Sequence, residues 1–225
     1  MNVVVLQFPG TNCEYDAKYA FEKLGATVSI IWYKDTTIAP NTDLVVLPGG
    51  FSYGDYLRSG ALAKISPIMS GVKEYASNGG KVLGICNGFQ ILTESGLLPG
   101  ALKRNNNLHF ISKYHTMKVI NNNNSFLNRL EKSDILDIPV AHHDGNYYID
   151  EAGLKELQEN EQILLQYCQK DGTTTSLNGS VEHIAGICNK EKNVFGLMPH
   201  PERAMEELLG GSDGIKMLEG FFSNK

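Results

Sequence analysis

Cys86 occupies the sharpest chemical pattern in the sequence. It is the middle residue of Gly84-Ile85-Cys86-Asn87-Gly88, which continues the apolar run at 82–85. The same pattern with serine forms a nucleophile elbow, a strand-to-helix turn in which glycines allow close backbone approach. The N-terminus of the following helix favours a thiolate over a thiol. We therefore predict that Cys86 is a nucleophile; the alternative is a buried structural cysteine beside a tight turn.

His200 is the best candidate for the base that such a nucleophile needs. It follows an apolar run at 194–198 and lies within Pro199-His200-Pro201-Glu202. Parallel α/β folds place reactive groups beyond the carboxyl ends of strands, so His200 and Cys86 could meet. Proline favours an extended preceding residue, and residues two apart in an extended chain face the same side. We predict that Glu202 orients His200; a surface turn with a solvated glutamate is the alternative.

Attack on an amide carbon also requires backbone N–H groups that stabilise the oxyanion. The elbow itself places the amide of Asn87 for this role. A second donor could come from Pro48-Gly49-Gly50-Phe51, which follows an apolar run at 44–47. Adjacent glycines allow an N–H to turn toward a ligand, so we predict that Gly50 is this donor. A plain loop is the alternative.

The elements that would position these residues alternate between strands and helices. Strands are predicted at 3–8, 27–32, 44–47, 82–85, 116–120, 163–168, 184–188 and 194–198. Helices are predicted at 17–24, 67–78, 87–95 and 151–159, with Ser66 as the N-cap of the second. This order predicts an α/β fold: a single flavodoxin-like domain over residues 1–225, with a mainly parallel central sheet, flanking helices and antiparallel strand additions.

Composition excludes several classes of function. The 225 residues carry a net charge of −5 with a pI of about 5.7, so no basic surface for nucleic acid is expected. No apolar run reaches the ~20 residues of a membrane helix, and the N-terminus lacks the basic flank of a signal peptide. The four cysteines show neither a Cys-x-x-Cys pair nor zinc spacing. We expect a cytoplasmic protein with free thiols, no metal and no membrane contact.

Taken together, these residues resemble the class I glutamine amidotransferases, and in particular the glutaminase subunits of phosphoribosylformylglycinamidine synthases. The resemblance covers essentially the whole chain. It is carried by 48–58 (PGGFSYGDYLR), 84–92 (GICNGFQIL), 96–101 (GLLPGA), 145–148 (GNYY), 178–180 (NGS) and 196–204 (GLMPHPERA).

The resemblance implies a chemical role for each matching residue. Cys86 would attack the glutamine side-chain amide and form a glutamyl thioester, and His200 would protonate the leaving ammonia and then activate water. Gln90 matches the position that helps to hold glutamine. The ammonia would pass to a separate large synthetase subunit, joined by a small third subunit, which uses ATP and magnesium to amidate formylglycinamide ribonucleotide. This chain has no Gly-x-x-x-x-Gly-Lys-[Ser/Thr] loop, so no cofactor is expected on it.

Two stretches depart from the family pattern, and several rival functions remain open. His142-His143-Asp144-Gly145 stands where His-Gly-Glu-Gly is expected, and Ser112 where a cysteine is expected. Within the class, the glutaminase could serve another acceptor, although 51–58 argues against this. A DJ-1/PfpI-like hydrolase would have histidine directly after the cysteine, where Asn87 stands. A binding module without chemistry, or a dinucleotide binder, is disfavoured by the intact Cys86, His200 and Glu202 and by the missing Gly-x-Gly-x-x-Gly.

Overall fold

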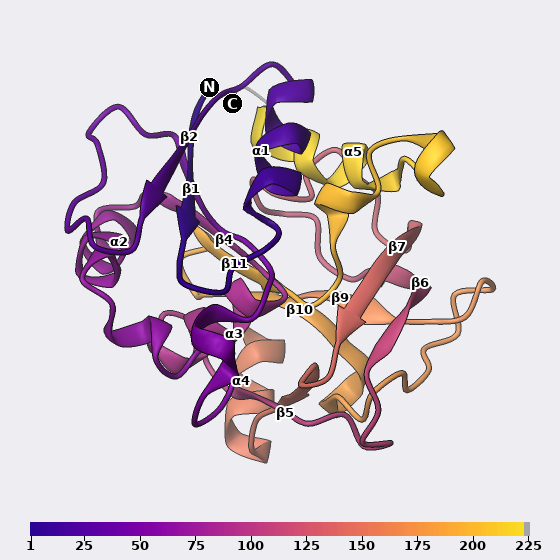
Figure 1. The fold of residues 1–225 in the computed structure, drawn as a ribbon. Coiled ribbons are helices and arrows are strands. Elements are labelled where there is room, and N and C mark those ends of the chain that lie inside the picture. The colour runs from indigo at the N-terminus through magenta and orange to yellow at the C-terminus, as the bar shows by residue number, and fades with distance from the viewer. Residues whose placement is uncertain (223–225) are drawn as a thin grey trace.

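A nine-stranded sheet forms the centre of the protein, whose computed structural model describes residues 1–222 (Figure 1). The strand order is β2-β1-β3-β4-β11-β10-β9-β6-β7. The strands are β1 (Asn2–Gln7), β2 (Thr27–Trp32), β3 (Leu44–Leu47), β4 (Lys81–Ile85), β6 (Ile111–Val119), β7 (Ile135–His142), β9 (Ile163–Tyr167), β10 (Ile184–Cys188) and β11 (Val194–Leu197). A separate pair is formed by β5 (Ala101–Lys103) and β8 (Asn146–Tyr148).

The sheet has a parallel half and an antiparallel half. Strands β2, β1, β3, β4 and β11 pair in parallel, in the spatial order of flavodoxin-like folds. Strands β10, β9, β6 and β7 then extend the sheet in antiparallel pairs. The inner strands β3 and β11 are buried along their whole length, as expected for parallel strands that are covered on both faces. The predicted fold class is confirmed.

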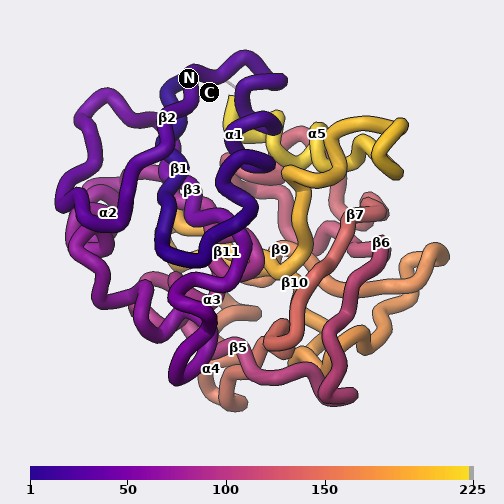
Figure 2. The backbone as a smooth tube through the Cα atoms, in the orientation of Figure 1, coloured from indigo at the N-terminus to yellow at the C-terminus, as the bar shows by residue number. Residues whose placement is uncertain are grey.

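Five helices among the described residues flank the sheet. They are α1 (Glu14–Lys23), α2 (Ile68–Ser77), α3 (Asn87–Glu94), α4 (Glu151–Glu159) and α5 (Asp213–Leu218). Of these, α1, α2 and α3 contact the parallel strands. Figures 1 and 2 show α1 and α2 on opposite sides of the parallel strands, with α5 beyond α1 toward β7. Both α1 and α5 pack against a short 3₁₀ helix, η4 (Pro201–Arg203). None of the helices within residues 1–222 is long and apolar enough to span a membrane.

The structure departs from the predicted elements in a few places. Strand β7 was not predicted; it contains Pro139 and lies at the edge of the sheet, where a missing backbone N–H is tolerated. Strand β6 is longer than the predicted 116–120, and α5 was not predicted. Ser66 is not the N-cap of α2, because Pro67 takes that place and the Ser66 hydroxyl bonds to the Tyr53 hydroxyl at 2.9 Å.

Candidate active site

Cys86 lies in the strained turn that the sequence predicts. It is the residue between β4 and α3, with φ 49° and ψ −103°. A Cβ on Gly88 would stand 1.9 Å from the Leu47 carbonyl oxygen, and one on Gly84 would stand 2.7 Å from the Gly88 carbonyl carbon. Real side chains do not tolerate such contacts, so the turn requires both glycines. The Cys86 N–H donates to the Leu197 carbonyl at 2.8 Å, which ties the turn to β11.

The structure brings His200 and Glu202 into direct contact. His200 Nδ1 and Glu202 Oε1 are 2.7 Å apart, and their side chains are 2% and 0% exposed. The His200 N–H donates to the Pro139 carbonyl at 2.8 Å, so the unpredicted strand β7 fixes this residue. The expected extended path through Glu202 is wrong, because Pro201 begins the 3₁₀ helix η4. The carboxylate reaches the imidazole from that turn instead.

The electrostatics of this pair favour a protonated imidazole. Burial lowers the pKa of His200, but the charges of Glu202 and Cys86 outweigh it and hold the pKa well above its ordinary value. Within the described chain, His200 Nε2 is buried without a hydrogen-bond partner. The Cys86 thiol lies 3.6 Å from the Ala141 carbonyl oxygen, on β7. The ring nitrogen opposite Glu202 is therefore free for chemistry.

Both glycines of the loop after β3 are required by close packing. Gly50 has φ +135°, and a Cβ there would stand 2.7 Å from the Asn12 nitrogen. A Cβ on Gly49 would stand 2.7 Å from His200 Cε1. Residues 10–13 hold this loop: the Phe51 N–H donates to the Gly10 carbonyl at 3.1 Å, and the Gly49 carbonyl accepts from the N–H of residue 13 at 3.3 Å.

Asn87 links the loop to the elbow. Its side-chain Oδ1 accepts from the Ser52 N–H at 3.1 Å, and its Nδ2 donates to Gln90 Oε1 at 2.8 Å. Gln90 Nε2 donates to the Asp144 carbonyl at 2.8 Å. The predicted site residues Gly50, Asn87 and Gln90 therefore all gather around Cys86.

A cavity of about 250 Å³ opens beside Cys86. Its lining combines predicted site residues with charged side chains for which no role in the site was predicted. The lining residues are Gly50, Phe51, Asp55, Leu57, Arg58, Ser59, Cys86, Gln90, Arg104, Ala141, His142, His143 and Asp144. His200 lines a smaller adjoining space of about 80 Å³, which shares Gly50, Phe51 and Ala141 with the first.

Two carboxylates give this cavity its character. Burial raises the pKa of Asp55 to about 6; the nearby Ser59 hydroxyl opposes the shift and the charge of Asp144 adds to it. Asp55 Oδ1 has no hydrogen-bond partner among the described residues. Asp144 accepts from Ser59 at 3.0 Å, bonds His143 at 2.9 Å and lies 3.8 Å from Arg104. The cavity thus holds an unpaired carboxylate oxygen beside a mixed-charge cluster.

The family departures fall in different environments. His143 and Asp144 line the cavity. The pKa of His142 is lowered to about 4 by burial and by the charge of His200, and its Nδ1 lies 3.1 Å from Asn105 Oδ1. Ser112 is exposed on β6 and does not line the cavity. The departures that can affect ligand binding are therefore His143 and Asp144.

One cluster of described residues has the composition of a metal site. Cys13 Sγ, a ring nitrogen of His200 and a carboxylate oxygen of Glu202 lie within 4.8 Å of one another, all buried. Arg203 Nη2, however, donates to Cys13 Sγ at 3.1 Å. Because a guanidinium already stands against the sulfur, a metal ion would have to displace this positive charge, and we assign none.

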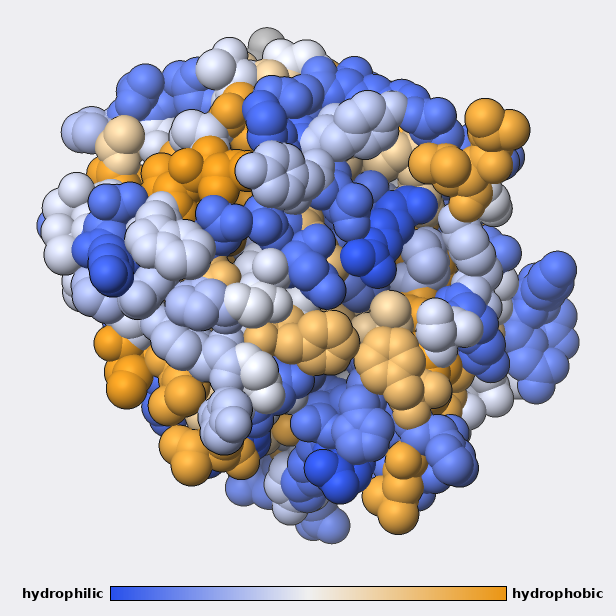
Figure 3. Space-filling model, in the orientation of Figure 1, coloured by the Kyte–Doolittle hydropathy of each residue, from blue (hydrophilic) through white to orange (hydrophobic). Residues whose placement is uncertain are grey.

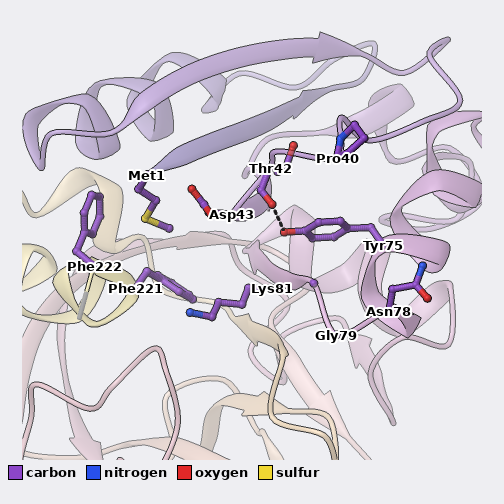
Figure 4. Close-up of a pocket in the computed structure, with 11 residues that line it drawn as sticks. Met1, Pro40, Thr42, Asp43, Tyr75, Asn78, Gly79, Lys81, Phe221 and Phe222 are labelled. Carbon is purple, nitrogen blue, oxygen red and sulfur yellow. Dashed lines mark hydrogen bonds between the residues drawn. The ribbon is translucent and has the colours of Figure 1, made fainter. Parts of the chain in front are cut away.

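A larger cavity, of about 790 Å³, lies away from these residues (Figure 4). Figure 4 shows Tyr75, Lys81 and Phe221 around it, with the Tyr75 hydroxyl bonded to the Thr42 carbonyl. Its walls include Met1 and the start of β4, at the opposite end of that strand from Cys86. It contains none of the predicted site residues, so size alone does not locate the site.

Comparison with known proteins identifies the class. Residues 1–210 match the family model described as a CobB/CobQ-like glutamine amidotransferase domain, and the chain belongs to this family of glutamine amidotransferases. It is 68% identical to the phosphoribosylformylglycinamidine synthase subunit PurQ of Sulfurimonas denitrificans, over 98% of this chain and 99% of the relative. It is 61% identical to PurQ of Wolinella succinogenes, over 98% and 99%. The solved structure of PurLQS from Thermotoga maritima contains a chain that is 43% identical with a TM-score of 0.88, over 98% and 97%.

Proposed function

We propose that this chain is the glutaminase subunit of a phosphoribosylformylglycinamidine synthase and acts in purine biosynthesis. The observation that carries the proposal is the Cys86 elbow beside the buried His200–Glu202 pair, at a cavity of about 250 Å³. The similarity to the PurQ subunits, over nearly the full length of both chains, supports the choice of pathway and argues against another acceptor.

The proposed chemistry uses the site as follows. The Cys86 thiolate attacks the amide carbon of glutamine, and the N–H groups of Gly50 and Asn87 stabilise the oxyanion. His200 gives its proton to the leaving nitrogen, which departs as ammonia and leaves a glutamyl thioester on Cys86. His200 then takes a proton from water, whose oxygen attacks the thioester carbon. The C–S bond breaks, glutamate leaves with its acid proton lost to solvent, and the Cys86 thiolate and His200 imidazolium are restored. Glu202 stabilises the imidazolium that both steps require.

The cavity charges suit the two ends of a free amino acid. Asp55, whose Oδ1 has no hydrogen-bond partner among the described residues, and its neighbour Asp144 can accept hydrogen bonds from the α-ammonium group of glutamine. Arg104, whose side chain is 64% exposed, can move from Asp144 to the α-carboxylate. Arg58 is held by two hydrogen bonds to Glu94, at 2.5 and 2.7 Å, and is therefore engaged elsewhere. Gln90 completes this proposed substrate site.

We further propose that the ammonia is used by a partner synthetase subunit, with a small third subunit in the same complex, as the name PurLQS indicates for the Thermotoga maritima structure. ATP and magnesium would be bound and used by that partner. Phe51 and Leu57 line the cavity yet are 44% and 84% exposed, which suits a surface that a partner covers. Figure 3 shows hydrophobic side chains among polar ones on the face that Figure 1 presents. The free cysteines suit a cytoplasmic location.

The direct test measures glutamate release from glutamine by the chain alone and with the synthetase subunits, ATP and acceptor. Wild type should be active and stimulated by the partners. Cys86→Ala should be silent, whereas Cys188→Ala, which removes another buried thiol, should match wild type. A wild-type chain that releases no glutamate even in the complex would refute the proposal. Reaction of Cys86 with electrophiles but not with glutamine would then favour the DJ-1/PfpI-like alternative.

A further inference from the structure

A chain of polar contacts joins the N-terminus of α1 to the residue after Glu202. Arg203 Nε donates to Asp16 Oδ2 at 3.0 Å, and Arg203 Nη2 donates to Cys13 Sγ at 3.1 Å. The Cys13 thiol donates to Asn12 Oδ1, also at 3.1 Å. Cys13 is the N-cap residue of α1 and is only 2% exposed. These contacts fasten α1 to η4, the short helix that carries Glu202.

The same thiol lies against the proposed base. Cys13 Sγ is within 4.8 Å of both a His200 ring nitrogen and a Glu202 carboxylate oxygen. The position of a Cβ on Gly49 would be 3.1 Å from Cys13 Sγ and 2.7 Å from His200 Cε1, so the sulfur and the ring edge meet on one side of the Gly49 backbone. Glu202 therefore bonds Nδ1 of the imidazole, and the Cys13 sulfur lies beside the edge of the ring.

The contacts of Cys13 are those of a neutral thiol rather than of a second nucleophile. Burial raises the pKa of Cys13 more than its contact with His200 lowers it. A neutral thiol can accept a hydrogen bond from Arg203 and donate one to Asn12, which is the pattern observed. A thiolate would have no proton to donate to Asn12.

We propose that Cys13 and Arg203 are positioning residues for the glutaminase reaction. Arg203 holds the η4 turn against α1 so that Glu202 keeps its 2.7 Å contact, and Cys13 holds the imidazole edge so that Nε2 stays aimed at the reacting groups. This inference rests on the proposed function, because it assigns His200 the role of base. Neither residue lines the cavity of about 250 Å³, and in the smaller adjoining space both lie beside His200. In this proposal both act through His200 and Glu202.

The chain offers a matched control. Cys188 is as buried as Cys13 but lies at the end of β10, opposite Phe195 near the start of β11 and away from the carboxyl end that leads to His200. Cys13→Ala and Cys188→Ala therefore each remove one thiol group from a similarly buried position. Cys13→Ser keeps a donor and an acceptor in nearly the same place. Arg203→Gln removes the guanidinium that bridges Asp16 and Cys13.

The experiment measures glutamate release by the reconstituted complex over a range of pH. Cys13→Ala should lower kcat about 3- to 10-fold, the effect of losing one hydrogen-bonded contact, and leave KM within twofold. The basic limb of the pH profile should move to lower pH, because the contact with Cys13 helps to keep His200 protonated. Cys13→Ser should recover part of the loss, Arg203→Gln should lower kcat similarly, and Cys188→Ala should match wild type.

Alkylation of Cys86 by iodoacetamide, located by peptide mass spectrometry in the isolated chain, gives a second readout of the same base. If Cys13→Ala and Arg203→Gln keep wild-type kcat and pH profiles, or if Cys188→Ala loses as much, the positioning role is overturned. If Cys13→Ala fails to fold, the kcat and pH profiles of Cys13→Ser and Arg203→Gln test the positioning role instead. If the wild-type complex releases no glutamate, and Cys86 is alkylated no faster than Cys188, the proposed function itself is overturned.

Discussion

Replacing Glu202 with glutamine tests the proposed base most directly. The carboxylate oxygen lies 2.7 Å from His200 Nδ1 with both side chains essentially buried, and glutamine can still accept that hydrogen bond. Two unit charges about 4 Å apart at an effective dielectric of about 20 attract by about 4 kcal/mol. A neutral hydrogen bond retains about 1 kcal/mol of this. The imidazolium form should therefore lose about 3 kcal/mol, and kcat should fall by about 10².

The direction of the pH effect follows from the sign of the shift. Glu202 raises the pKa of His200, so its removal lowers that pKa, and the basic limb of the kcat profile should move to lower pH. The assay is glutamate release by the complex. The control is Glu159→Gln, which makes the same chemical change on an exposed helix face. Thermal unfolding checks that Glu202→Gln is folded. Activity within threefold of wild type and an unmoved basic limb would show that Glu202 does not support His200 as argued.

Three further predictions address the elbow, the glycine loop and the cavity. Gly88→Ala should lower the free energy of unfolding in urea by about 3 kcal/mol, because its Cβ would meet the Leu47 carbonyl at 1.9 Å. Gly25 has a positive φ but open space around it, so Gly25→Ala should lower the free energy of unfolding by only about 1 kcal/mol. Equal losses in the two variants would contradict the packing argument. Gly49→Ala should lower kcat at least tenfold with little change in KM, because its Cβ would displace His200; a KM effect alone would count against this. The pKa of Asp55 is raised to about 6, so the carboxylate is protonated and KM for glutamine should rise as pH falls through 6. Asp55→Asn should raise KM about tenfold at pH 8 and remove this pH dependence. An unchanged KM would exclude Asp55 from the substrate site.

The sequence predicts the local parts of this site well. The elbow around Cys86 is specified by its own glycines, and most parallel strands are continuous apolar runs that stand out in the sequence. Strand β7 was missed because Pro139 interrupts its pattern, and only its place at the sheet edge makes that residue acceptable. No role was predicted for Cys13 or Asp55: Cys13 lies just before α1, and Asp55 is one position of the 48–58 stretch with no periodic pattern to mark it. Their importance arises from contacts with residues far away in the chain.

The predicted roles of Cys86, His200 and Glu202, and of a single domain over 1–225, remain predictions that kinetics and unfolding must test. The contact between His200 and Glu202 was predicted from an extended path that the chain does not follow. The residue types and their two-residue spacing were sufficient to identify the pair, but the 3₁₀ turn that joins them depends on packing against α1 and α5. Spacing therefore predicted which residues meet without predicting how.

What sets the distance between nucleophile and base is the register of two neighbouring strands. Strands β4 and β11 pair in parallel with Ile85 opposite Leu197, and the Cys86 N–H continues this ladder by donating to the Leu197 carbonyl. His200 follows three residues later, where β7 holds its N–H. A shift of one residue in this register would turn alternate side chains to the other face and separate the pair. The edge strand β7 holds the base and its Ala141 carbonyl contacts the nucleophile, so a segment without a chemical signature fixes the geometry on which the proposed reaction depends.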